Sequence, residues 1–171
     1  MDRLGLACPP MSLRTWMNEN LATQGYCLAS DEAWALAIGL RFSTALCFAL
    51  VTVGVVLQSW VLLLALSAVG FVAGFTSRHP FDHLWNHGVR HVLGGPPLPP
   101  NPARRRHAFK VGTAWLLAVA GCFGAGWSIA GLALGAALLA ACASVTVLNL
   151  CIPSVALSLL ERRRPKEVLP A

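Results

Sequence analysis

The chain has 171 residues, of which 56% are hydrophobic and only 12% are charged, and its mean hydropathy is +0.63. Soluble domains carry roughly 25% charged residues, and a soluble chain this apolar would expose large apolar patches. The composition therefore excludes an ordinary soluble domain and predicts an all-α, polytopic membrane protein, because helices satisfy their own backbone in lipid. The net charge is +6, and the basic residues border the apolar runs. This position favours the lipid bilayer and its anionic lipids as partners over nucleic acid.

The ends of the chain differ from its middle. Residues 1–32 are mixed in composition, and we expect a cytoplasmic tail with a short helix near residues 12–21. Residues 33–160 are predicted to form the membrane domain, and residues 161–171 a basic C-terminal tail.

Four apolar runs within this domain predict four transmembrane helices arranged as two hairpins, at residues 42–58, 60–76, 110–127 and 129–150. The two hairpin turns carry no charge, whereas Lys and Arg gather on the opposite side. The positive-inside rule therefore places both termini and the central segment in the cytoplasm. Two small-residue rows, Gly70 with Gly74 and Gly131 with Gly135, predict close helix packing, within the bundle in preference to a dimer interface.

The central segment contains all five histidines. Residues 80–93 predict an amphipathic helix that lies on the membrane surface, since apolar residues recur at helical spacing: Phe81, Leu84, Trp85, Gly88, Val89 and Val92. Asp82, Asn86 and Arg90 are expected on its polar side. Residues 94–102 are proline-rich and predict an extended spacer. The run of Arg104, Arg105 and Arg106 is expected to bind anionic lipid.

Four histidines follow one another at intervals of four residues in this helix: His79, His83, His87 and His91. Pairs at this spacing can share a divalent transition metal through neutral imidazole, so the row is a candidate metal site. Two alternatives stay open. Histidine also suits a headgroup boundary as a structural residue, and exposed histidines can make a surface responsive to pH.

Two polar residues end the fourth apolar run. Asn149 is the only amide in that run, and it is expected to hydrogen-bond another helix. Cys151 follows at the cytoplasmic boundary, on the same side of the membrane as the histidines, and is a candidate reactive thiol.

The sequence resembles a bacterial family of small integral membrane proteins catalogued as domain of unknown function 4395, over about residues 38–160. The matching features are Arg41-Phe42, the tight turn before Trp60, the proline-rich central segment, the run 106–110 and the end 149–154. The resemblance implies a location in the bacterial inner membrane. Members of that family often carry a C-x-x-C motif at this end, whereas here the second position is Ser154, which weakens a dithiol function.

No nucleotide-binding loop, no Ser/His/Asp arrangement and no paired carboxylates occur in the sequence, so we expect a protein that is not an enzyme. The first hypothesis is an accessory or assembly subunit of a larger membrane complex, or a homo-oligomer, because the spans lack the ionisable residues of transporters. A metal- or cofactor-binding protein that uses the histidine row is the second hypothesis. A thiol- or sulfur-handling protein that uses Cys151 is the third.

Overall fold

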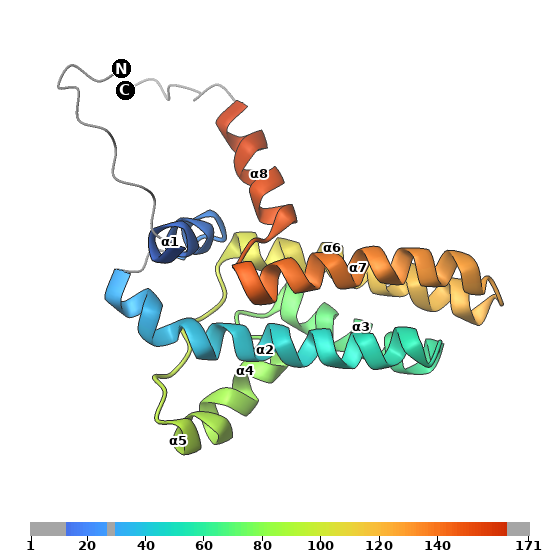
Figure 1. Cartoon of the computed structure of the whole chain (residues 1–171), viewed down its shortest axis with the longest axis horizontal. Coiled ribbons are helices and arrows are strands. Elements are labelled where there is room, and N and C mark those ends of the chain that lie inside the picture. The colour runs from blue at the N-terminus through green and yellow to red at the C-terminus, as the bar shows by residue number, and fades with distance from the viewer. Residues whose placement is uncertain (1–12, 27–29, 164–171) are drawn as a thin grey trace.

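The computed structural model describes residues 13–26 and 30–163, which are helical apart from short connections and the segment 94–102 (Figure 1). The elements in chain order are α1 (Leu13–Thr23), α2 (Ser30–Val56), α3 (Trp60–Phe75), α4 (Pro80–Leu84), the π-helical turn η1 (Trp85–Val89), α5 (Arg90–Leu93), α6 (Ala103–Gly124), α7 (Ser128–Leu148) and α8 (Ile152–Arg163). The prediction of an all-α protein is confirmed for these residues.

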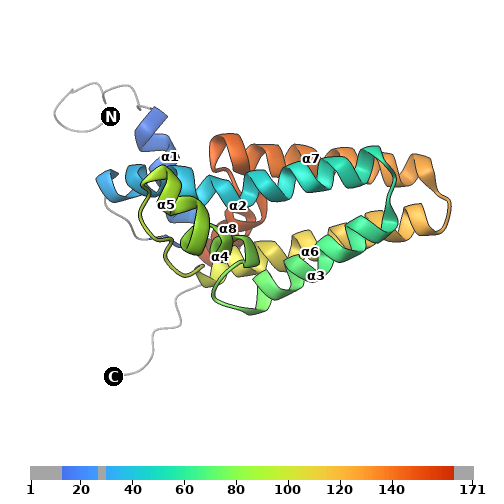
Figure 2. The same ribbon diagram turned by 90° about the horizontal axis from the view of Figure 1, so that it is seen from below.

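Four long helices, α2, α3, α6 and α7, lie side by side in two layers (Figure 2). Helices α2 and α7 form one layer, and α3 and α6 form the other. The chain reverses direction after α2, where Gln58 adopts a positive φ of 50°, and again after α6. An apolar cluster forms the core between the layers and consists of Val51, Val55, Leu63, Leu66, Leu116, Val119, Ala120, Phe123 and Leu138.

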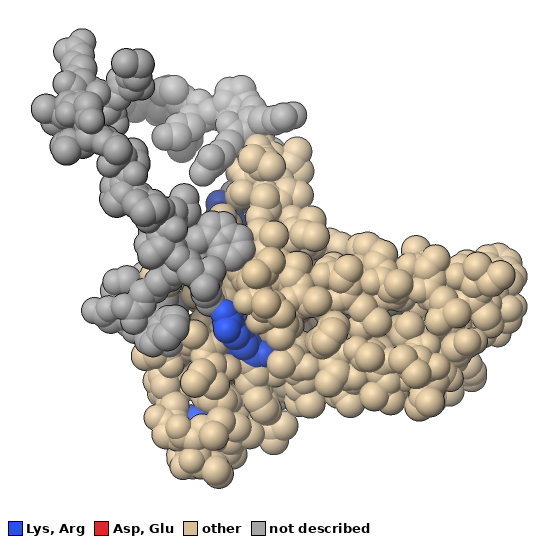
Figure 3. All heavy atoms as spheres, viewed as in Figure 1, with Lys and Arg blue, Asp and Glu red and all other residues tan. Residues whose placement is uncertain are grey.

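The outer surface of this bundle carries many exposed apolar side chains. Large apolar side chains such as Val61, Phe71, Leu117 and Ile129 are exposed there. On the face shown in Figure 3, Lys and Arg gather at the end of the bundle that carries α1 and α8. Two helices, Ala35–Val56 and Ser128–Leu148, are long and apolar enough to cross a membrane, and a third span results if α3 and the bent continuation 80–93 count as one.

The small-residue rows pack within the bundle, as predicted. A methyl group added to Gly70 would lie 2.6 Å from Thr113 Oγ1 of α6, and one added to Gly74 would lie 2.8 Å from Lys110 Cγ. Gly131 meets the ring of Phe123, and Gly135 meets Val55 of α2. Small residues at these positions let the helix backbones approach closely.

The central helix differs from its prediction in the face that it buries. Trp85 is 1% exposed, and Asp82 and Asn86 are buried beside it, whereas Leu84 is exposed and Val92 is 86% exposed. The physical reason is packing: the Asp82 carboxylate accepts from Ser43 of α2, and Asn86 Oδ1 accepts from the backbone N–H of Leu98, so this side of the helix faces the protein. The buried face packs on the first part of α2. The prediction that Asp82 and Asn86 lie on a solvent-facing polar side is therefore wrong.

A second apolar cluster holds this central helix in place. It joins α1, the start of α2, η1 and the proline-rich segment through Leu21, Tyr26, Leu36, Leu40, Trp85 and Leu98. The segment 94–102 has no helical residues after Gly94, as predicted. It folds back over Trp85, whose Nε1 donates to the carbonyl of Pro96 at 3.1 Å.

Helix α7 ends at Leu148, five residues before Pro153. Asn149 adopts the left-handed conformation with φ of 54°, which asparagine tolerates better than most residues. Helix α1 supplies donors for the carbonyls left free at this end: Asn20 Nδ2 donates to Leu148 at 3.1 Å, and Gln24 Nε2 donates to Asn149 at 2.6 Å. The N-terminal helix is therefore part of the packed fold.

Candidate functional site

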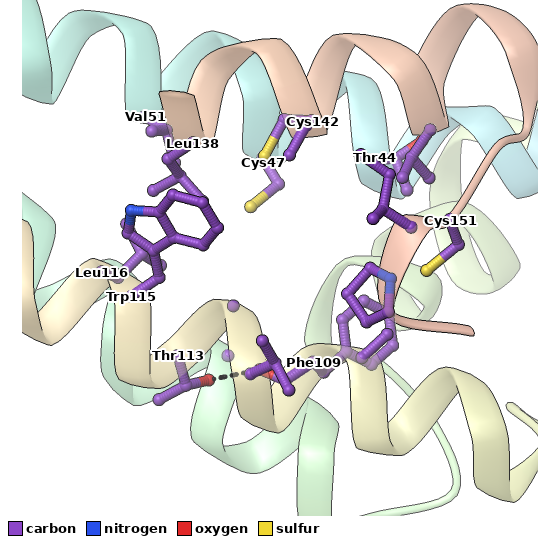
Figure 4. A pocket seen from close by; sticks show the side chains of 18 of the residues that line it. Thr44, Cys47, Val51, Phe109, Thr113, Trp115, Leu116, Leu138, Cys142 and Cys151 are labelled. Atoms are coloured by element: carbon purple, nitrogen blue, oxygen red, sulfur yellow. Dashed lines mark hydrogen bonds between the residues drawn. The ribbon is translucent and has the colours of Figure 1, made fainter. Parts of the chain in front are cut away.

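A cavity of about 520 Å³ lies between α2, α6 and α7 and extends to the start of α8. Figure 4 shows Val51, Leu116 and Leu138 at one end of it and Thr44 and Cys151 at the other. Its walls are almost entirely apolar. Most of its polar lining residues belong to the second end, namely Gln24, Ser43, Thr44, His79, Arg105 and Cys151, whereas Thr113 lies along its body. Small-molecule sites in proteins have volumes of roughly 300–1,000 Å³ and this composition, so the cavity is the candidate site.

His79, the N-cap residue of α4, lines this polar end. The imidazole is 3% exposed, and its Nδ1 accepts a hydrogen bond from the backbone N–H of Phe81 at 3.1 Å. A neutral imidazole with an accepting Nδ1 carries its proton on Nε2. Among the described residues Nε2–H has no hydrogen-bond partner.

Burial lowers the pKa of His79 to about 4, while the Asp82 carboxylate opposes this decrease and the Arg105 guanidinium adds to it. The unfolded chain has a histidine pKa near 6.5, so between about pH 6.5 and pH 4 the unfolded state binds more protons. We expect the free energy of unfolding to be constant above about pH 6.5 and to decrease as the pH falls below it. His79→Asn keeps the helix cap but removes the imidazole, so denaturant titrations of this variant should show a smaller decrease. Equal decreases in both proteins would show that another group is responsible.

A buried hydrogen-bonded network continues from His79 to Arg105. The Asp82 carboxylate accepts from Ser43 Oγ at 2.6 Å, from the backbone N–H of His79 at 2.9 Å and from Asn101 Nδ2 at 2.8 Å. Tyr26 donates its hydroxyl proton to Asn101 Oδ1 at 2.9 Å. This network ties together α1, α2, α4 and the proline-rich segment.

Arg105 completes the network from α6. Its Nη1 donates to the Tyr26 hydroxyl at 2.7 Å, and its Nη2 donates to the carbonyl of Leu40 at 3.3 Å. Both acceptors are uncharged, and the residue is only 5% exposed. Burial raises the pKa of Tyr26, and the Arg105 guanidinium partly opposes this. The side chain of Arg105 points into the protein and not towards the membrane surface, and the binding of anionic lipid by Arg104, Arg105 and Arg106 stays a prediction.

Three cysteines line the cavity. Cys47 of α2 and Cys142 of α7 lie next to each other on neighbouring helices at one side of the cavity, and Cys151 lies at the polar end (Figure 4). Cys151 is buried and precedes α8, and its Sγ accepts a hydrogen bond from Ser154 Oγ at 3.1 Å. The sequence predicted Cys151 and the histidines on one side of the protein, and the structure brings Cys151 and His79 to the same cavity. A reactive thiol at Cys151 stays a prediction.

The four histidines do not form one continuous row. His79 is turned inward, whereas His83, His87 and His91 are exposed, and the rings of His83 and His87 stack with their centroids 6.0 Å apart. In the described part of the chain no group of three or more His, Cys, Asp or Glu residues could hold a metal ion. A metal shared by His83 and His87 alone stays a prediction, and His79 does not belong to it.

Comparison with family models places most of this architecture in one family. The model described as Domain of unknown function (DUF4395) matches residues 37–162, which is well over half of the chain. The chain belongs to the DUF4395 family. Comparisons with curated proteins and with solved structures give no match. The resemblance noted from the sequence over residues 38–160 is thus confirmed.

The matched region of this DUF4395 protein contains every cavity-lining residue except Gln24. Sequence reasoning missed His79 as a cavity residue and missed Gln24, Tyr26 and Asn101 altogether. One signal was present for His79: a residue that precedes Pro80 and stands three positions before Asp82 fits a helix N-cap. The backbone carbonyl of Asn149 accepts from Gln24, which follows α1. A hydrogen bond from the Asn149 side chain to another helix stays a prediction.

Proposed function

We propose that this DUF4395 protein is a multi-pass membrane protein, without catalytic activity, that binds a small apolar molecule with a polar head in the cavity between its helices. The observation that carries the proposal is the distribution of groups in the cavity. Its body is lined by apolar side chains, whereas hydrogen-bonding groups gather at one end. An amphipathic molecule matches this distribution, since it presents the same two surfaces.

The membrane arrangement that we propose has four spans, made by α2, α3, α6 and α7. Helix α3 has 16 residues, slightly fewer than the roughly 17–25 typical of a span. Support comes from its place in the bundle, where it lies alongside α6 and presents exposed apolar residues such as Phe71. With both termini on the cytoplasmic side of a bacterial inner membrane, the polar end of the cavity lies at the cytoplasmic headgroup level. The predicted role as a subunit of a larger complex or homo-oligomer stays a prediction.

Two glycines of α6 provide a matched test of the cavity. Gly112 lines it, and a methyl group added there would have no other atom within 4 Å. A methyl group added to Gly121 would also have no atom within 4 Å, but Gly121 is exposed and does not line the cavity. Leucine is favoured over glycine inside a helix, so neither substitution should weaken α6. We expect Gly112→Leu to fill the cavity and Gly121→Leu to leave it open.

The measurement is the amount of small apolar molecule that co-purifies with each protein, determined by mass spectrometry of solvent extracts. Wild type and Gly121→Leu should retain stoichiometric ligand, and Gly112→Leu should retain about a tenth or less. Equal ligand content in all three proteins, or none in any of them, would contradict binding in this cavity.

A further inference from the structure

The polar end of the cavity offers two different donors to a bound head group. One is the imidazole of His79, which lines the cavity and whose Nδ1 is already occupied by the backbone N–H of Phe81, so that Nε2–H is the ring's remaining donor. The other is the guanidinium of Arg105, which carries five N–H donors and makes hydrogen bonds to two uncharged acceptors. A head group that accepts hydrogen bonds therefore fits this end, and a cationic head group does not.

The charge balance favours an anionic head over a neutral one. Asp82, the carboxylate of the same network, already accepts three hydrogen bonds from uncharged donors and is joined to Arg105 through Tyr26 and Asn101. The charge of Arg105 thus has no carboxylate in direct contact among the described residues. A buried guanidinium pairs with a carboxylate through short, charge-assisted hydrogen bonds, which a neutral head cannot provide.

The apolar part of the cavity sets the shape of the rest of the molecule. Arg105 and Leu116 line opposite ends and lie three turns apart on α6, roughly 16 Å along its axis. Val51 and Leu138 close the far end in the middle of the bundle (Figure 4). A single extended hydrocarbon chain matches a long, apolar space of this volume.

We propose that the cavity binds a single-chain carboxylate, a free fatty acid, with its carboxylate on His79 Nε2 and Arg105 and its chain directed towards Val51 and Leu138. This inference rests on the proposed function and specifies the chemical class of its ligand. The chain direction also agrees with a fatty acid in one leaflet, whose head lies at the membrane surface.

The test compares dodecanoate with 1-dodecanol, which share a chain and differ in the head group. Binding is measured by native mass spectrometry in a detergent with a rigid steroid tail, so that no detergent chain fills the cavity. We expect wild type to bind dodecanoate about tenfold or more tightly than dodecanol, since hydrogen bonds to charged groups are the stronger ones. His79→Asn, which keeps the helix cap, should weaken dodecanoate binding about tenfold.

The outcomes separate the two proposals. Equal affinity for dodecanoate and dodecanol, or unchanged dodecanoate affinity in His79→Asn, would overturn the fatty-acid inference while leaving a ligand-binding cavity intact. No binding of either compound to wild type, together with no difference between Gly112→Leu and Gly121→Leu, would overturn both. Loss of dodecanoate binding in Gly112→Leu but not in Gly121→Leu would support both.

Discussion

Replacing Asp82 by alanine is expected to reduce the free energy of unfolding by about 3–5 kcal/mol. The carboxylate is buried, and the substitution leaves three donors without their acceptor: Ser43 Oγ, the backbone N–H of His79 and Asn101 Nδ2. Titration of the purified protein from mild detergent into SDS, followed by circular dichroism, measures the change.

Ser43→Ala is the control for this prediction, because it removes one of the three donors and leaves the carboxylate in place. Its expected cost is about 1 kcal/mol, that of a single hydrogen bond. If Asp82→Ala costs no more than Ser43→Ala, the network does not hold the central helix to the bundle, and the apolar cluster around Trp85 must do so alone.

Replacing Trp85 by alanine is the second substitution with a large expected effect, again about 3–5 kcal/mol. The indole is 1% exposed and fills the space between α2 and the proline-rich segment. Methyl groups added to Gly39 and Gly95 would lie 2.8 and 2.6 Å from its ring, so both backbones already touch it. Its removal leaves a large void and a carbonyl of Pro96 without its donor.

Trp127→Ala is the matched control, since Trp127 is 67% exposed at the far end of the bundle. This substitution should change the free energy of unfolding by less than about 1 kcal/mol. Similar losses for the two tryptophans would mean that Trp85 is not buried as described, and the central helix would then rest on the membrane surface as the sequence suggested.

Much of the fold could be predicted from the sequence, because lipid imposes a simple rule on long apolar runs. The observed helices α3 and α7 lie within two residues of the predicted 60–76 and 129–150. Helices α2 and α6 begin earlier than predicted, at Ser30 and Ala103, because a helix continues through charged residues once they reach a polar environment. Hydropathy predicts the limits of the apolar part of a helix, and the helix itself can begin earlier in the sequence.

The candidate site could not be predicted in the same way, since it depends on which residues face inward. Among the three consecutive arginines, Arg105 alone is buried, because successive residues of a helix point in directions about 100° apart. Asp82 and Asn86 of the central helix are buried by hydrogen bonds to Ser43 and Leu98, and the composition of the helix does not indicate these distant partners. The cavity brings together residues from five separate elements, and that proximity arises only through packing.

The cap that α1 provides for α7 has a consequence for the limits of the domain. The family match begins at residue 37, after Asn20 and Gln24, which donate to the last carbonyls of α7. A chain trimmed to the matched residues therefore loses the donors at that helix end and one wall of the cavity, since Gln24 lines it. We therefore expect a chain trimmed to residues 37–162 to be less stable than the full chain, although the family model matches every residue that it keeps.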